Sequence, residues 1–129
     1  MKTGTRFHQN ASCKITFCAA IPNQLRAKTR EVSCVDVPEN LRKQGMATQL
    51  LKNVCDEADA GKIILLLFVK PFGGNPSMDK EQLIEWYANK FGFAVIQTKP
   101  SIMMARMPFA TPGYFKPTLI TSALQGQTK

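Results

Sequence analysis

The clearest hydrophobic pattern in the chain lies in residues 44–60. Its apolar positions recur at helical spacing, at Met46, Leu50, Leu51, Val54 and Ala58. Gly61 follows this pattern at the place where a helix commonly ends. The sequence therefore predicts a helix from Gln44 to Ala60.

A second helix is predicted from Asp79 to about Phe91. Asp79 and Gln82 have the spacing of a capping box, in which each side chain bonds the other residue's backbone N–H. Gly92 ends the pattern. The apolar face of this helix comprises Leu83, Ile84, Tyr87 and Phe91.

Five segments carry patterns typical of β-strands: residues 14–20, 30–37, 62–69, 93–98 and 102–107. In the first, Ile15, Phe17 and Ala19 share one face, and Pro38 ends the second because it lacks a backbone N–H. Residues 62–69 are apolar on both faces, which predicts a central strand with helices on both sides. The strand–helix–strand order predicts a right-handed crossover, and the last two segments an antiparallel hairpin.

The chain of 129 residues has the size of one domain, with 44% hydrophobic and 20% charged residues. We expect residues 1–108 to form that domain and residues 109–129 to be a tail that is partly packed or disordered. The longest apolar run, residues 63–69, is far shorter than the ~20 residues of a membrane-spanning helix, so no membrane partner is expected. Residues 1–10 lack the pattern of a secretory signal, and the expected compartment is the cytoplasm.

The chain is basic, with a formal net charge of +8. Such a charge favours acidic partners or anionic ligands. The sequence contains no run of five or six basic residues, which argues against a nucleic-acid arm and against nucleic acid as a direct substrate. A polyanionic cofactor is the other class of ligand that this charge suits.

Cysteine and histidine positions argue against a metal site. Cys13, Cys18, Cys34 and Cys55 form no C-x-x-C pair, and the chain has one histidine, His8. Cysteines in apolar stretches most often serve as small hydrophobic residues, and a single histidine is more often structural or solvated than catalytic. We therefore expect no bound metal.

Residues 37–48 run from a strand end through a short basic loop into the first predicted helix. A helix N-terminus presents unpaired backbone N–H groups and the positive end of the helix dipole. Gly45 would let a phosphate approach the backbone, and Arg42 and Lys43 add positive charge. The segment predicts a diphosphate cradle, whereas the P-loop and dinucleotide-binding glycine motifs are absent from the sequence. The alternative is a glycine that starts a helix beside a solvated charged corner.

The run Arg42-Lys43-Gln44-Gly45-Met46-Ala47 resembles the Arg-x-x-Gly-x-Ala coenzyme A pyrophosphate motif of the GNAT N-acetyltransferases. A second signature follows at the distance expected for that family. It is a helix that carries Trp86-Tyr87 and closes with Phe91-Gly92-Phe93. Together the two motifs cover about residues 30–107.

The resemblance implies an α/β (α+β) fold with a mixed, largely antiparallel sheet flanked by helices. It also implies that acetyl-CoA lies in a splayed parallel strand pair, the first strand of which bulges. The backbone at Val35 and Val37 would bond the pantetheine arm. The remaining cofactor-binding residues implied are Arg42, Lys43, Gln44, Gly45, Met46, Ala47 and Thr48.

Two residues are implied in catalysis. Glu31 matches the general-base glutamate and would act through a water; the alternative is a surface carboxylate that pairs with Arg30 or Lys28. Tyr87 resembles the tyrosine that protonates the coenzyme A sulfur, but it lies five residues before Gly92, where the family has four. One residue turns a helix by about 100°. Either a bulge restores the direction or Tyr87 packs in the core.

The resemblance implies acetyl transfer to a primary amine, on a protein or a small molecule. Family members usually carry two helices between their first and second strands, whereas only about thirty residues precede Glu31. The reduction implies an open groove, a macromolecular acceptor, or completion of the site in a homodimer. The alternative functions are a catalytically inactive acyl-CoA-binding or protein-interaction module and, with steep salt dependence, a nucleic-acid binder.

Overall fold

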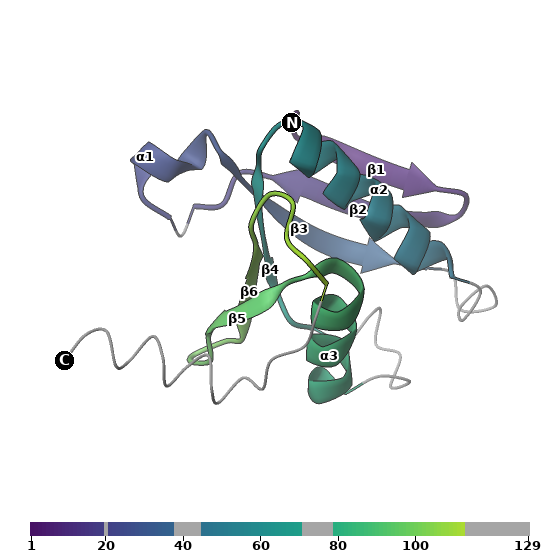
Figure 1. The fold of residues 1–129 in the computed structure, drawn as a ribbon. Helices are drawn as coiled ribbons and strands as arrows, with labels where there is room; N and C mark the ends of the chain where they lie inside the picture. The colour runs from purple at the N-terminus through teal and green to yellow at the C-terminus, as the bar shows by residue number, and fades with distance from the viewer. Residues whose placement is uncertain (20, 38–44, 71–78, 113–129) are drawn as a thin grey trace.

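A six-stranded sheet of order β1-β2-β3-β4-β6-β5 forms the frame of this computed structural model (Figure 1). The structure describes residues 1–19, 21–37, 45–70 and 79–112. The strands are β1 (Gly4–His8), β2 (Ala11–Thr16), β3 (Thr29–Asp36), β4 (Ile64–Phe68), β5 (Ala94–Gln97) and β6 (Met103–Arg106). Among these, β3 and β4 pair in parallel and all other neighbours pair antiparallel. The mixed, largely antiparallel sheet confirms the predicted fold class.

Two long helices, α2 (Met46–Ala60) and α3 (Lys80–Phe91), cover the same face of the sheet. Their buried residues join one core cluster with Leu65 and Leu67 of β4. Leu66, which points the other way, belongs to a smaller cluster that contains no residue of either helix. Within the described ranges no helix covers this second face, in contrast to the prediction of helices on both sides of residues 62–69. That strand is apolar on both faces because Cys18 and Met103 contact its second face.

The β1–β2 hairpin was not predicted from the sequence. It turns at residues 9–10, where Gln9 has φ 52°, and β1 pairs with β2 along its whole length. The predicted strand at residues 14–20 correspondingly begins earlier and ends at Thr16. Phe17 lies beyond the strand, 53% exposed, with the Arg30 guanidinium 4.4 Å from its ring centre. Phe17 is therefore outside the strand that was predicted to place it on the face of Ile15.

The short helix α1 (Asn23–Arg26) is the one helix that the structure describes between β2 and β3. It contains no buried residue. Figure 1 shows α1 beyond the end of the sheet rather than across a face. The described part of the chain before Glu31 therefore leaves the sheet face opposite α2 and α3 without a helical cover.

Helix α2 ends by a backbone arrangement that the sequence did not indicate. Gly61 has an ordinary φ of −94°, and Lys62 takes the left-handed conformation with φ 55°. The Lys62 N–H donates to the Asp59 carbonyl and the Ile63 N–H to the Ala58 carbonyl, at 3.1 and 2.8 Å. These bonds form a Schellman motif, which offsets the cost of a left-handed lysine.

Helix α3 has the predicted limits. The Gln82 N–H donates to the Asp79 carboxylate at 2.8 Å, and the Asp79 N–H donates to the Gln82 side chain at 3.0 Å. Gly92 follows the helix with φ 81°. An added Cβ at Gly92 would lie 3.0 Å from the Ala110 Cβ, so both the backbone conformation and the close approach require glycine.

A half-buried ion pair connects β6 to α2. The Arg106 guanidinium donates to both Asp59 oxygens, at 2.7 and 3.1 Å, and its Nε donates to the Phe91 carbonyl at 2.6 Å. The Phe109 N–H also donates to Asp59, at 2.7 Å. This network ties the two helices to the last strand and to the segment that follows Pro108.

Candidate functional site

The parallel strands β3 and β4 separate partway along their length. Their pairing covers Thr29 with Ile64, Arg30 with Leu65 and Glu31 with Leu66. Beyond this point β3 continues to Asp36 and β4 to Phe68, and the described residues show no further pairing between the two strands. Figure 1 shows the half of the sheet that contains β1, β2 and β3 turned away from the half that contains β4, β6 and β5. The separation opens a gap in the middle of the sheet.

A β-bulge lies in β3 beside this gap. Between the pairs Lys14–Ser33 and Ser12–Asp36, β2 advances by two residues and β3 by three, so β3 carries one extra residue. Cys34, which is exposed, has φ 54° in this stretch. A bulge and a splay were the features expected of the strand that precedes the cofactor motif, and β3 has both.

Val35 and Val37, the residues predicted to bind the pantetheine arm, follow the bulge and have their side chains on the face of the sheet that α2 and α3 cover. Val35 is half-buried and packs against the main core, and Val37 is 5% exposed. These side chains therefore contribute packing. Any role in binding a ligand falls to the backbone, as the resemblance implied.

Helix α2 begins next to the gap. Gly45 is its N-cap, with φ 79°, and no side chain of the described residues forms a hydrogen bond that caps the helix. Gly45 is exposed, and an added Cβ there would meet no described atom within 4 Å, so within the described part of the chain this N-terminus is open. Met46 and Ala47 pack against the core and fix the first turn, while Thr48 is half-buried. Arg42, Lys43 and Gln44 lie outside the described residues.

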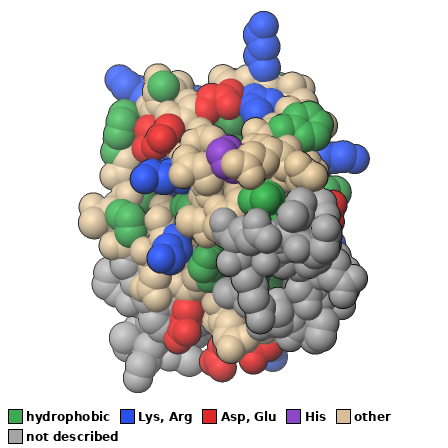
Figure 2. Space-filling view, turned by 90° about the vertical axis from the view of Figure 1, so that its right-hand side faces the viewer, with side chains coloured by type: hydrophobic (Ala, Val, Ile, Leu, Met, Phe, Trp, Pro, Cys, Tyr) green, Lys and Arg blue, Asp and Glu red, His purple; other side chains and the backbone are tan. Residues whose placement is uncertain are grey.

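A surface pocket of about 370 Å³ adjoins this helix start, on the side of the molecule where Figure 2 shows the histidine in purple. It is lined by His8, Gln9, Gly45, Met46 and Gln49. His8 and Gln9 were missed from the sequence because the β1–β2 hairpin was missed. Gln9-Asn10, a pair that tolerates a tight turn, was the available signal.

Glu31 lies at the point where the strands separate. It is half-buried, opposite Thr16 on β2 and Leu66 on β4, and therefore on the sheet face that carries no long helix. Among the described residues Glu31 forms no ion pair. The Arg30 guanidinium instead donates to the carbonyls of Met1 and Thr29, both at 2.9 Å. The ion pair between Glu31 and Arg30, which was the alternative to a catalytic role for Glu31, is therefore not formed.

Tyr87 lies in the core on the helix-covered face. It is 3% exposed, with its ring 5.1 Å from Trp86 and 5.7 Å from Phe93, centre to centre. Helix α3 is α-helical throughout, without the bulge that would reorient this residue. Burial, and to a lesser extent the neighbouring Cys13 thiol, raise the pKa of the Tyr87 phenol above its usual range. The phenol is therefore protonated at neutral pH.

The described residues offer neither a metal-ligand cluster nor a helix able to span a membrane. No group of three His, Cys, Asp or Glu side chains comes together in them as a ligand set, and none of their helices is long and apolar enough to cross a membrane.

Burial raises the pKa of the Cys13 and Cys55 thiols to about 11 and about 12, so both are neutral at physiological pH.

Several solved structures share this fold. The anti-CRISPR protein AcrVA5 superposes with a TM-score of 0.57 at 19% identity, over 81% of this chain and 98% of that one. An N-acetylglutamate synthase from Neisseria gonorrhoeae, in complex with coenzyme A and L-arginine, gives 0.53 at 18% identity, over 78% of this chain and 22% of that one. A protein from Desulfovibrio desulfuricans assigned to the GNAT acetyltransferases gives 0.51 at 13% identity, over 76% and 60%. No protein-family model and no curated protein sequence matches the chain.

The chain therefore has the GNAT fold. It spans a small part of the synthase and less than two thirds of the Desulfovibrio protein, but nearly all of AcrVA5.

Proposed function

We propose that this protein is an N-acetyltransferase that moves an acetyl group from acetyl-CoA to a primary amine. The observation that carries the proposal is the divergence of β3 from β4 beyond Glu31 and Leu66. Strands that separate expose backbone groups that a ligand can pair with. The open N-terminus of α2 at Gly45 supplies donors for an anion at the same place.

In this proposal the cofactor's diphosphate binds the amides of residues 45–48, with Arg42, Lys43 and Gln44 adding charge and donors. The backbone at Val35 and Val37 bonds the pantetheine arm. Two features support this arrangement. The first turn of α2 contains no acidic residue to repel phosphate, and a structural neighbour is a coenzyme A complex.

Acetyl transfer requires a neutral amine. Glu31 would accept the ammonium proton, through a water, on the open face of the sheet. The amine nitrogen then attacks the thioester carbonyl, the new C–N bond forms, and the C–S bond breaks. The departing thiolate takes a proton, for which Tyr87 is the candidate donor because its phenol is protonated at neutral pH. The nitrogen loses its second proton as the amide forms, and that proton passes to solvent, from which the Tyr87 phenolate is reprotonated.

The packing of Tyr87 favours a second candidate function, a GNAT-fold module that binds acyl-CoA without turnover. The phenol is almost fully enclosed by the core. Burial raises the pKa of the Tyr87 phenol above that of a free tyrosine, which is already higher than the ordinary thiol value of about 8.5. Proton donation from Tyr87 to a thiolate is therefore less favourable than donation from a free tyrosine.

Calorimetric titration with acetyl-CoA, combined with a thiol-release assay on a panel of primary amines, separates the two functions. Binding together with amine-dependent thiol release supports the transferase. Binding with no release for any amine supports the module. Absence of binding contradicts both.

A further inference from the structure

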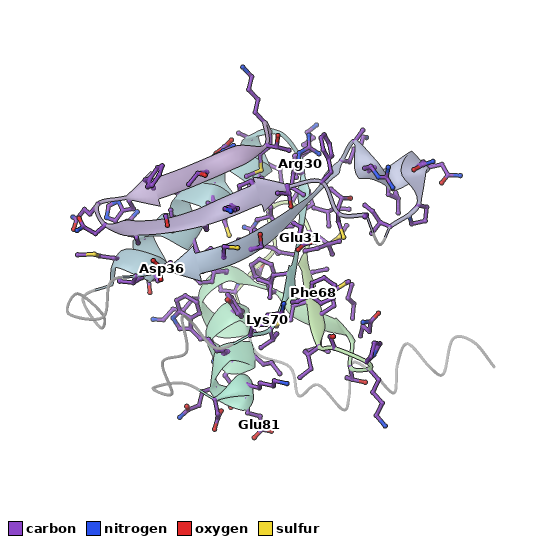
Figure 3. The ribbon with its side chains drawn as sticks, turned by 180° about the vertical axis from the view of Figure 1, so that it is seen from behind. Arg30, Glu31, Asp36, Phe68, Lys70 and Glu81 are labelled. Carbon is purple, nitrogen blue, oxygen red and sulfur yellow. The ribbon has the colours of Figure 1, made fainter. Side chains whose placement is uncertain are left out.

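The sheet face that no described helix covers carries a regular pattern of charge beside Glu31. Cross-strand partners share a face, so the pairs Thr16–Glu31, Lys14–Ser33 and Ser12–Asp36 form three successive rungs on it. Glu31, Lys14 and Asp36 thus give the order negative, positive, negative along β2 and β3. Figure 3 shows the molecule from behind Figure 1, with this face toward the viewer. Glu31 and Asp36 lie toward opposite ends of β3.

These three charges are available to a ligand. Lys14 and Asp36 are exposed and Glu31 is half-buried. None of the three belongs to an ion pair among the described residues. Ser12 and Thr16 are four residues apart on β2, so the outer carboxylates are about 13 Å apart along the strand, at ~3.4 Å per residue.

This spacing matches an extended peptide. In a β-conformation, residues i, i+2 and i+4 point to the same side and advance by the same rise as β2. A segment with a basic residue at each end and an acidic residue between them would place every charge opposite its complement. A purely basic segment would meet Lys14 and the net charge of +8, both of which repel it.

We propose that the acceptor is a lysine in an extended protein segment of alternating charge that lies along β2 and β3 on the open face. The acceptor lysine lies at Glu31, an acidic residue two positions away at Lys14, and a second basic residue four positions away at Asp36. This inference rests on the proposed acetyltransferase function and names its substrate class. The absence of a helical cover in the described chain before Glu31 leaves room for such a segment.

The test uses peptides with one acceptor amine, blocked at both ends. The matched sequences are Lys-Ala-Glu-Ala-Arg and its reverse, because either chain direction fits the charges. The mismatched peptides carry arginine in place of the central glutamate. We expect kcat/KM to be about fivefold higher for at least one matched peptide than for its mismatched partner, as exposed pairs contribute modestly.

Charge reversal provides the specific control. Lys14→Glu should invert the ratio of kcat/KM between matched and mismatched peptides. Lys52→Glu, an equal change in net charge on the exposed side of α2, should leave that ratio as in the wild type. The ratio is measured within each variant, so a general loss of activity does not affect it.

The outcomes separate this inference from the function on which it rests. Acetyl-CoA binding with small-amine turnover, but an equal ratio in the Lys14→Glu and Lys52→Glu variants, overturns the docking surface and leaves the acetyltransferase in place. A protein that binds no acetyl-CoA overturns the function and the inference together. Inversion of the ratio in Lys14→Glu alone supports both.

Discussion

Glu31 and Leu66 are the last residues at which β3 and β4 face each other across a paired ladder. Glu31 therefore lies at the apex of the gap that we assign to acetyl-CoA. Its side chain shares the open face with Leu66, while α2 and α3 cover the other face. In the function proposed above, this carboxylate would lie between an acceptor on the open face and a thioester held between the strands.

The first prediction concerns this carboxylate. Glu31→Gln should lower kcat by about 10²- to 10⁴-fold, the range in which a positioned general base contributes. The Kd for acetyl-CoA, measured by calorimetry, should stay within about twofold because Glu31 lies outside the diphosphate cradle. A variant that retains wild-type turnover at neutral pH would remove Glu31 from the mechanism.

Gly45→Ala should weaken acetyl-CoA binding by about tenfold, equivalent to ~1.4 kcal/mol. The added methyl would project into the space that the diphosphate must enter, and φ 79° adds about 1 kcal/mol of backbone strain to the folded state. Gly61→Ala, at the opposite end of α2 with φ −94°, is the matched control. Equal affinities in the two variants would place the diphosphate elsewhere.

Tyr87→Phe distinguishes the core role of this residue from its catalytic one. The phenol makes no hydrogen bond with a described residue, so its removal should not lower the free energy of unfolding. If Tyr87 donates the proton, kcat falls while stability does not, and we expect this result. Unchanged turnover would leave Tyr87 as a core residue alone. Tyr87→Ala, which creates a cavity, should cost about 3–5 kcal/mol.

Two ion pairs of α2 should differ in their contribution to stability. Asp59→Asn breaks a pair whose side chains are 18% and 6% exposed and should cost about 2–3 kcal/mol by urea denaturation. Glu57→Gln breaks the pair with Arg6, whose side chains are 41% and 22% exposed, and should cost at most about 1 kcal/mol. Equal losses would show that burial does not set the difference.

The Asp59 pair also predicts a pH dependence. Hydrogen bonding from Arg106, and then from the Phe109 N–H, holds the pKa of Asp59 below its usual value despite partial burial. A depressed carboxylate pKa stabilises the folded state above the unfolded pKa of about 3.9, and this stabilisation is lost as the pH falls through the folded pKa. Wild-type protein should therefore lose more stability than Asp59→Asn when the pH is lowered below about 4. Parallel pH profiles would contradict the assignment.

The sequence by itself determined most of the local elements and indicated the segment that we propose binds the cofactor. Asp79 and Gln82 fixed the start of α3 and Gly92 its end, because caps and left-handed glycines depend on neighbouring residues. The spacing of Leu50, Leu51 and Val54 fixed the buried face of α2 for the same reason. The resemblance that began at Arg42 indicated the GNAT fold, which the solved structures bear out.

Only the tertiary structure decided the rest. The β1 strand depends on its pairing with β2, and the shared face of α2 and α3 depends on contacts between distant segments. The charge pattern of Lys14, Glu31 and Asp36 likewise appears only when β2 is in register with a bulged β3. One residue more or less in that bulge would reverse which side chains lie on the open face. The resemblance implied a bulge in this strand, but the hydrophobic pattern does not set its position or its register with β2.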